Sequence, residues 1–125
     1  MPKALPPLGD LEHEIAQLIW THGSMTAAAI RKLIPRPLKD PTIRTVLRRL
    51  EDKGYLFHTV ESGAFMYHAK EKRDEIAARA VRRIVDSFCN GSVEHVLTSM
   101  VKAALLDPHE LQLIANKMKK RLKSR

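Results

Sequence analysis

The chain has 125 residues and carries 22 Lys and Arg residues against 14 Asp and Glu residues, for a formal net charge of +8 at pH 7. This length allows one domain or two small ones, and no run approaches the roughly 18 apolar residues of a membrane-spanning helix. We expect a cytoplasmic protein, because the first residues lack an apolar secretory signal and the single cysteine, Cys89, excludes an internal disulfide framework.

Two helices are predicted near the start of the chain, at residues 9–22 and 27–34. In the first, Gly9 is a tolerated cap and Glu12 follows three residues later, as in a capping box. In the second, Thr26 is placed to cap the helix after a short extended link, and Pro35 stops it. The apolar stripe of the first helix contains Leu11, Ile15, Leu18 and Ile19, and we assign the neighbouring Trp20 to the core.

The stretch of residues 40–54 predicts a third helix with signals at both ends. Asp40 is positioned to cap the first free N–H groups, and Pro41 at the first helical position loses no intrahelical bond. Gly54, just past the end, favours the left-handed closing conformation. One apolar stripe runs along this helix and contains Ile43, Val46, Leu47 and Leu50.

The opposite side of this third helix offers arginine and threonine side chains. A guanidinium binds phosphates or a guanine edge and a threonine methyl contacts thymine, so this face has the chemistry of a major-groove reader. Two short helices joined by a tight link also match the helix-turn-helix plan. An ordinary solvated helix face is the alternative. The outward residues are Thr42, Thr45, Arg48, Arg49 and Asp52, with Arg44 on the flank.

Residues 55–60 and 64–69 are rich in aromatic and β-branched residues, and residues 61–63 between them predict a hairpin loop. Three helices followed by a hairpin is the element order of a winged helix. The loop holds no Lys or Arg, which argues against a strong minor-groove contact by this wing. His58 and His68 are candidates for a metal pair across the hairpin, but we favour two ordinary surface histidines and expect no metal, because no third ligand has useful spacing.

A second unit is expected to start at Glu71, which divides the chain into residues 1–70 and 71–125. It begins with an amphipathic helix of about 19 residues, whose apolar pattern includes Cys89 as a buried small residue. Ser92 caps the next helix, in which Ala104 is the last inward residue. The last helix begins at Asp107 and Pro108, the clearest helix start in the chain.

Three helices of this length have too little mutual surface to bury their apolar stripes, so a second copy of the chain is the natural partner in a two-fold dimer. A self-sufficient three-helix unit is the alternative. The residues that we expect to form the dimer interface are Ile76, Ala80, Ile84, Phe88, Val96, Met100, Leu111, Ile114, Met118 and Leu122.

The positive charge is concentrated at the end of the chain. Residues 117–125 hold six Lys and Arg residues and no acid, which leaves 16 basic and 14 acidic residues in 1–116. The total charge suggests a polyanionic partner, whereas the tail on its own is also explained by cations that stabilise the last helical turn. DNA affinity must therefore come from a local patch.

Several segments resemble the penicillinase-repressor family of bacterial transcription regulators, which includes the β-lactamase and methicillin-resistance repressors. The resemblance covers roughly residues 8–120. Its most specific piece is Thr-Ile-Arg-Thr at 42–45 followed by Arg-Leu at 49–50, and it continues at residues 18–20, 51–54, 88–91 and 106–111.

The resemblance implies a homodimer with N-terminal winged helices and a C-terminal three-helix dimerisation region that binds inverted repeats in operator DNA. In this family, release typically follows proteolysis within the dimerisation region, usually at an Asn–Phe bond. The matching pair here is Ser99–Met100, which departs from that pattern and leaves the trigger open. The copper-responsive relatives end in a Cys-rich tail, and the absence of such cysteines argues against copper sensing.

Together these observations predict a mainly α protein with a small β-hairpin that acts as a dimeric repressor on double-stranded operator DNA, without enzymatic activity or cofactor. Lys39, Arg44, Arg48 and the helix N-termini would contact phosphates, while Thr45 and Arg49 would reach base edges and Thr42 would lie beside them. Two alternatives stay open. One is a winged-helix module that binds protein, and the other is a regulator that binds a small molecule between its two units.

Overall fold

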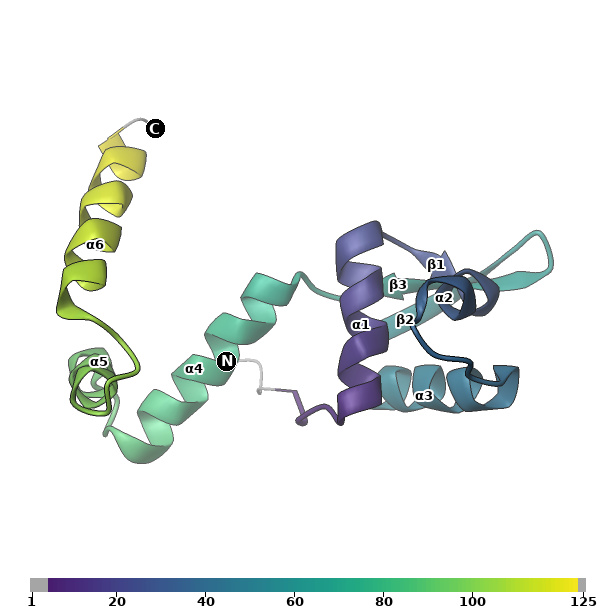
Figure 1. Cartoon of the computed structure of the whole chain (residues 1–125), viewed down its shortest axis with the longest axis horizontal. Coiled ribbons are helices and arrows are strands. Elements are labelled where there is room, and N and C mark those ends of the chain that lie inside the picture. Colours follow the sequence, from purple (N-terminus) through teal and green to yellow (C-terminus); the bar gives the residue numbers. More distant parts are fainter. Residues whose placement is uncertain (1–4, 124–125) are drawn as a thin grey trace. The chain divides into compact units, whose positions relative to one another are not determined.

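Six helices and one three-stranded antiparallel sheet make up the part of the chain that the structure describes, residues 5–123 of a computed structural model (Figure 1). The chain divides into two compact units between Ala80 and Val81. The elements in order are α1 (Asp10–His22), β1 (Met25–Thr26), α2 (Ala27–Leu33), α3 (Asp40–Asp52), β2 (Leu56–Glu61), β3 (Ala64–Ala69), α4 (Arg73–Phe88), α5 (Val93–Lys102) and α6 (Pro108–Lys123). The predicted class, mainly α with a small hairpin, is confirmed.

The predicted caps of the first two helices are present. The Gly9 N–H donates to Oε1 of Glu12 at 2.8 Å, and Thr26 Oγ1 accepts the N–H of Ala29 at 3.1 Å. Gly23 closes α1 with a φ of 91° and donates its N–H to the Ile19 carbonyl. These local bonds satisfy helix-end groups that would otherwise lack intrahelical partners.

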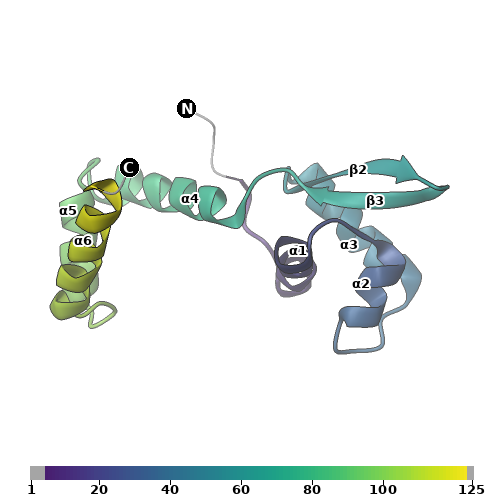
Figure 2. The same cartoon turned by 90° about the horizontal axis from the view of Figure 1, so that it is seen from above.

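The link between α1 and α2 is a strand of the sheet, which the sequence did not indicate. Met25 pairs with Tyr67 and Thr26 pairs with Met66, so β1 joins the hairpin and the sheet order is β1-β3-β2. A two-residue strand is too short for a period-2 pattern, and its partner lies 40 residues away. Helices α1 to α3 lie on one side of the hairpin (Figure 2).

The start of α3 differs from the prediction by one residue. The N-cap is Lys39, whose carbonyl accepts the N–H groups of Thr42 and Ile43, and Pro41 is the second helical residue. Asp40 is therefore no cap. Its carboxylate instead accepts a hydrogen bond from Arg31 Nη1 at 3.0 Å, which forms an exposed ion pair to α2.

The end of α3 is closed by Gly54, as predicted. Gly54 has a φ of 89° and donates its N–H to the Glu51 carbonyl, while the Tyr55 N–H reaches back to the Leu50 carbonyl at 2.9 Å. This pair of bonds is a Schellman motif. Because it uses the Tyr55 N–H, β2 begins one residue later than the expected strand, at Leu56.

The hairpin turn consists of Ser62 and Gly63, which both have positive φ angles, 53° and 79°. A two-residue turn with this geometry matches the right-handed twist of the flanking strands. His58 pairs with Tyr67, whereas His68 sits one position further along β3, so the two histidines point to opposite faces of the hairpin. Within residues 5–123 no group of three or more His, Cys, Asp or Glu side chains is arranged to hold a metal ion.

The apolar stripe of α3 forms the centre of the N-terminal core. All four predicted stripe residues are buried there, and Trp20 packs partly buried against the same cluster, as expected. The buried residues are Ile15, Ala16, Ile19, Met25, Ile30, Ile34, Ile43, Val46, Leu47, Leu50, Tyr55, Leu56 and Tyr67. This core fixes which side of α3 faces outward.

The C-terminal unit has little core of its own. Ser92 caps α5 by accepting the His95 N–H, and Asp107 accepts the N–H of His109 at the start of α6, both at predicted positions. Ala104 lies beyond the end of α5 with a φ of 60°, so it does not continue the helix as expected. Among the described residues of this unit, only Val85 and Cys89 are buried. No helix within residues 5–123 is long and apolar enough to cross a membrane.

Candidate nucleic-acid interface

The outward face of α3 carries the side chains that the sequence suggested for DNA contact. Because the apolar stripe is buried, the polar side of the helix is exposed along its whole length. The Thr45 hydroxyl donates to the Pro41 carbonyl at 2.8 Å, so its hydrogen is occupied and its methyl group and the oxygen's acceptor lone pairs are left for an outside contact. The exposed candidates are Lys39, Thr42, Arg44, Thr45, Arg48 and Arg49.

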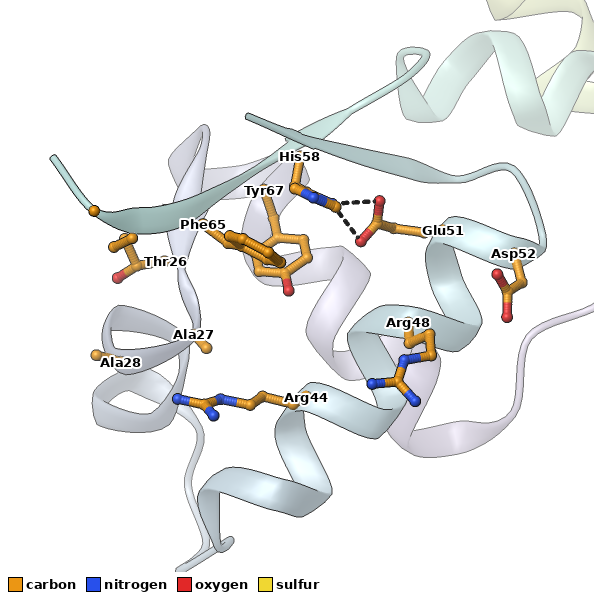
Figure 3. A pocket seen from close by; sticks show the side chains of 12 residues that line it. Thr26, Ala27, Ala28, Arg44, Arg48, Glu51, Asp52, His58, Phe65 and Tyr67 are labelled. Atoms are coloured by element: carbon orange, nitrogen blue, oxygen red, sulfur yellow. Dashed lines mark hydrogen bonds and ion pairs between the residues drawn. The ribbon is translucent and has the colours of Figure 1, made fainter. Parts of the chain in front are cut away.

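The structure separates these candidates into two flanks of α3. Arg44 and Arg48 both line a groove between α3 and the hairpin (Figure 3). Arg49 lies toward α1, where its charge helps to lower the pKa of Glu12. Arg44 and Arg48 share one flank because residues at i and i+4 lie on the same side of a helix. Arg49, one residue further, lies on the other flank.

The groove has a volume of about 800 Å³ and is formed by three elements, α3, the hairpin and the start of α2. This volume lies within the usual range for ligand pockets, about 300–1,000 Å³. The groove also holds two carboxylates, so its charge is mixed rather than uniformly positive. Its lining residues are Thr26, Ala27, Ala28, Arg44, Arg48, Glu51, Asp52, His58, Gly63, Ala64, Phe65 and Tyr67.

An aromatic wall from the hairpin forms one side of the groove. The His58 ring stacks on Phe65 with ring centroids 4.1 Å apart and planes 11° apart, and Tyr67 follows at 6.3 Å from Phe65. His58 Nδ1 also lies 2.7 Å from a carboxylate oxygen of Glu51 on α3. This contact ties the hairpin to the recognition helix candidate.

Tyr67 is buried, with 6% of its surface exposed, and its hydroxyl points into the groove (Figure 3). Burial raises the pKa of this phenol, and the negative charge of Glu51 raises it further, whereas the positive charges of Arg44 and Arg48 act in the opposite direction. The two guanidinium groups therefore lie close enough to Tyr67 to interact with it electrostatically.

The C-terminal end of α3 is anchored through Glu12, a buried carboxylate of α1. Lys53 Nζ donates to Glu12 at 2.8 Å and to the Pro7 carbonyl at 3.0 Å. The Lys53 bond lowers the pKa of Glu12, the Gly9 N–H lowers it as well, and burial opposes both. Tyr55 donates its hydroxyl to the Pro6 carbonyl, so residues 6–7 are fastened beside α3.

The residues expected in the dimer interface occupy different environments. Ile76 packs partly buried against the N-terminal core, whereas Phe88 is 81% exposed. Val96, Met100 and Leu111 are half-buried. The exposed members are Ala80, Ile84, Phe88, Ile114, Met118 and Leu122.

Ser99 and Met100, the pair at the expected cleavage position, lie inside α5. The Ser99 hydroxyl donates to the His95 carbonyl at 2.8 Å, and both flanking turns are helical. A protease would need to unwind this helix locally to reach the bond.

The sequence did not indicate Phe65, Tyr67 or the start of α2 as part of the site. A weak signal existed, because residues 65 and 67 alternate and so share one face of their strand. That this face turns toward α3 depends on the pairing of β1 with β3, which the sequence did not reveal.

Comparison with known proteins gives consistent matches over most of the chain. Residues 8–120 match the family described as "Penicillinase repressor". The penicillinase repressor of Bacillus licheniformis is 29% identical over 111 residues, which cover 87% of each chain. The methicillin resistance regulatory protein MecI of Mammaliicoccus sciuri is 22% identical over 116 residues, covering 91% of this chain and 94% of its own.

Two solution structures share the N-terminal fold. The DNA-binding domain of the repressor BlaI matches with a TM-score of 0.52, and monomeric Bacillus licheniformis BlaI in complex with the blaP half-operator matches with a TM-score of 0.50. Each is 30% identical and covers 59% of this chain and 93% of its own.

Proposed function

The chain belongs to the penicillinase repressor family, and from this premise we propose that it is a transcriptional repressor that binds operator DNA through α3 and acts without catalysis in the cytoplasm. The observation that carries the proposal is the exposed face of α3, on which Arg44, Arg48 and Arg49 flank Thr45. A relative of 30% identity with this fold was solved on a half-operator, which supports the same use of the fold here.

Two roles are proposed within this face. Lys39, Arg44 and Arg48 contact phosphates and set the position of the helix on the duplex. Thr45 and Arg49 reach base edges, where a guanidinium binds guanine with two hydrogen bonds and a methyl group contacts thymine. The shared groove position of Arg44 and Arg48, away from Arg49, supports this division.

The active form is proposed to be a homodimer built by residues 71–125. Phe88, Ile84 and Ile114 expose large apolar surfaces in a unit with only two buried residues among those described, and burial of such surface is the main driving force for association. Large exposed apolar patches mark interaction sites. A two-fold dimer would place two α3 helices on half-sites about one helical turn, roughly 34–36 Å, apart.

Release of the repressor is proposed to occur through a regulatory protease that cuts between Ser99 and Met100. Cleavage there would divide α5 and separate Val96 from α6, so the dimer interface would lose its continuity. Mass spectrometry of the chain recovered from its host tests this step. A fragment ending at Ser99 supports it, and an intact chain during derepression contradicts it.

The repressor proposal is tested by selecting duplexes from a random pool. We expect the selected duplexes to contain an inverted repeat and to bind more tightly than random duplexes, with affinity that falls steeply as salt rises because counterions are released. Equal binding of all duplexes contradicts operator recognition. Failure to bind any duplex, together with binding of a protein or a small molecule, supports one of the two alternative functions instead.

A further inference from the structure

The hydroxyl of Tyr67 is a polar group that the fold leaves without a partner. The side chain is more than nine-tenths buried, and its hydroxyl has no hydrogen bond to any residue in the described range 5–123. Figure 3 shows the hydroxyl pointing into the groove between α3 and the hairpin. The hydroxyl oxygen itself keeps access to the groove although the rest of the side chain is covered, so it is free to donate a hydrogen bond to a ligand there.

Two cationic donors face the same space. Arg44 and Arg48 both line the groove, with the Arg44 guanidinium on the side of Ala27 and Ala28 and the Arg48 guanidinium further along α3 (Figure 3), and neither forms an ion pair within the structurally described part of the chain. Each guanidinium presents five N–H donors and no acceptor. The Tyr67 hydroxyl adds a further donor, so the three side chains together suit an anion with several acceptor oxygens.

The remaining lining favours a phosphate that carries an organic group, such as the sugars on either side of a phosphodiester. Ala28, Ala64 and Phe65 contribute apolar surface to the lining, and a volume of about 800 Å³ far exceeds that of a single inorganic anion. The groove also runs along the flank of α3, so a duplex read by this helix would bring its backbone to the groove. Glu51 is held by His58 and does not pair with either guanidinium.

We infer that the Tyr67 hydroxyl and the guanidinium groups of Arg44 and Arg48 form a binding site for one phosphodiester of the DNA backbone in each half-site. This inference rests on the proposed function and adds a hairpin residue, Tyr67, to the DNA contacts. Because a phosphate is the same at every position of a duplex, the contact strengthens binding to operator and random DNA alike.

The test uses Tyr67→Phe with Tyr55→Phe as its matched control, since these are the two tyrosines of the chain. A hydrogen bond to a charged group corresponds to roughly a ten-fold effect, so we expect Tyr67→Phe to weaken operator and random duplex binding about 10-fold each. Its thermal midpoint should not fall, because its hydroxyl has no partner in the free chain. Tyr55→Phe loses the bond to Pro6 and should lower the thermal midpoint while operator affinity is kept.

A second measurement locates the phosphate. Single phosphates of the operator are replaced by neutral methylphosphonates, and binding of the wild-type chain and Tyr67→Phe is compared. On a duplex with the critical phosphate replaced, we expect Tyr67→Phe to bind as tightly as the wild-type chain. The substitution and the replacement would then remove the same contact, and this should happen at one position per half-site. Arg48→Gln should show non-additivity at the same position and reduce the salt slope by about one unit. Additive effects at every position would overturn the inference.

The outcomes separate this inference from the proposed function. If the wild-type chain binds no duplex, both fail. If it binds the operator and Tyr67→Phe binds equally well, only the phosphate site is overturned. The other possible source of the phosphate is a free anion. Titration with inorganic phosphate at constant ionic strength, followed by NMR, tests whether the groove binds it. Binding of the free anion that requires Tyr67, with unchanged duplex affinity in the variant, would assign the groove to a small anion and overturn the backbone contact.

Discussion

Lys53, at the C-terminal end of α3, lies 2.8 Å from the carboxylate of Glu12 in the first turn of α1, and Glu12 is 7% exposed. This ion pair joins α3, the helix that carries the proposed DNA-contacting side chains, to α1. Its shielded position distinguishes it from the exposed pair between Arg36 and Glu14. The end of α3 is therefore held to α1 by a shielded contact, in addition to the packing of its apolar stripe.

Removal of this carboxylate should destabilise the N-terminal unit. Glu12→Gln leaves Lys53 without its charged partner, and we expect the free energy of unfolding to fall by about 2 kcal/mol, as for other hydrogen bonds to charged groups. Urea denaturation measures the change. The control is Glu14→Gln, which removes an exposed ion pair and should cost under about 1 kcal/mol. Equal losses in the two variants would contradict a special role for Glu12.

The Glu12 carboxylate should also make the free energy of unfolding depend on pH in the acidic range. The pKa of Glu12 is lowered in the folded chain from its ordinary value of 4.5, mainly by the hydrogen bond from Lys53. A group with a lowered folded pKa contributes stability that is present above its unfolded pKa and is lost as pH falls through the folded pKa. We expect the free energy of unfolding to decrease below pH 4.5 in the wild-type chain and to decrease less in Glu12→Gln. Parallel curves would show that other groups cause the acid sensitivity.

Arg49 is the proposed base reader on the flank of α3 away from the groove. Arg49→Ala should cost about 1–3 kcal/mol in operator binding and relax the base preference at one position per half-site. Arg48→Ala is the comparison, since a phosphate contact weakens binding to every duplex. Selection from a random pool with each variant measures both effects. Loss of affinity without any change in preference would reassign Arg49 to the phosphates.

Glu51 places a negative charge in the groove that is proposed to hold the DNA backbone. Glu51→Gln removes this charge and keeps an oxygen that can accept from His58, so we expect operator affinity to rise about 2-fold, as for roughly 0.5 kcal/mol of repulsion at about 8 Å in water. Glu94→Gln on α5 changes the net charge equally and should leave affinity unchanged. A gain in both variants would indicate a general charge effect.

Phe88 should be covered in the dimer, because it is 81% exposed in a unit that also exposes Ile84, Ile114 and Met118. Phe88→Asp places a charge in the proposed interface, and we expect sedimentation at micromolar concentration to shift from two chains to one. Operator affinity should then fall to that of a single half-site. Asn116→Asp, on the polar side of α6, is the control. A wild-type chain that sediments as a monomer would contradict the proposed dimer.

Local patterns determined much of the secondary structure. The stripe from Ile43 to Leu50, the glycine at 54 and the caps at Thr26 and Ser92 act within a few residues of themselves, so their consequences are visible in the sequence. The outward placement of Arg44, Arg48 and Arg49 follows from the same stripe. These features were enough to predict the helices, the hairpin and the face proposed for DNA.

Only the tertiary structure decided how these pieces form a site. The pairing of Met25 with Tyr67 turns β1 into a strand, and the contact of His58 with Glu51 holds the hairpin beside α3, so Tyr67, Arg44 and Arg48 line one groove. The bond from Lys53 to Glu12 likewise joins residues 41 positions apart. Contacts of this kind depend on packing between distant segments, and a period of 2 or 3.6 residues along one segment contains no information about them.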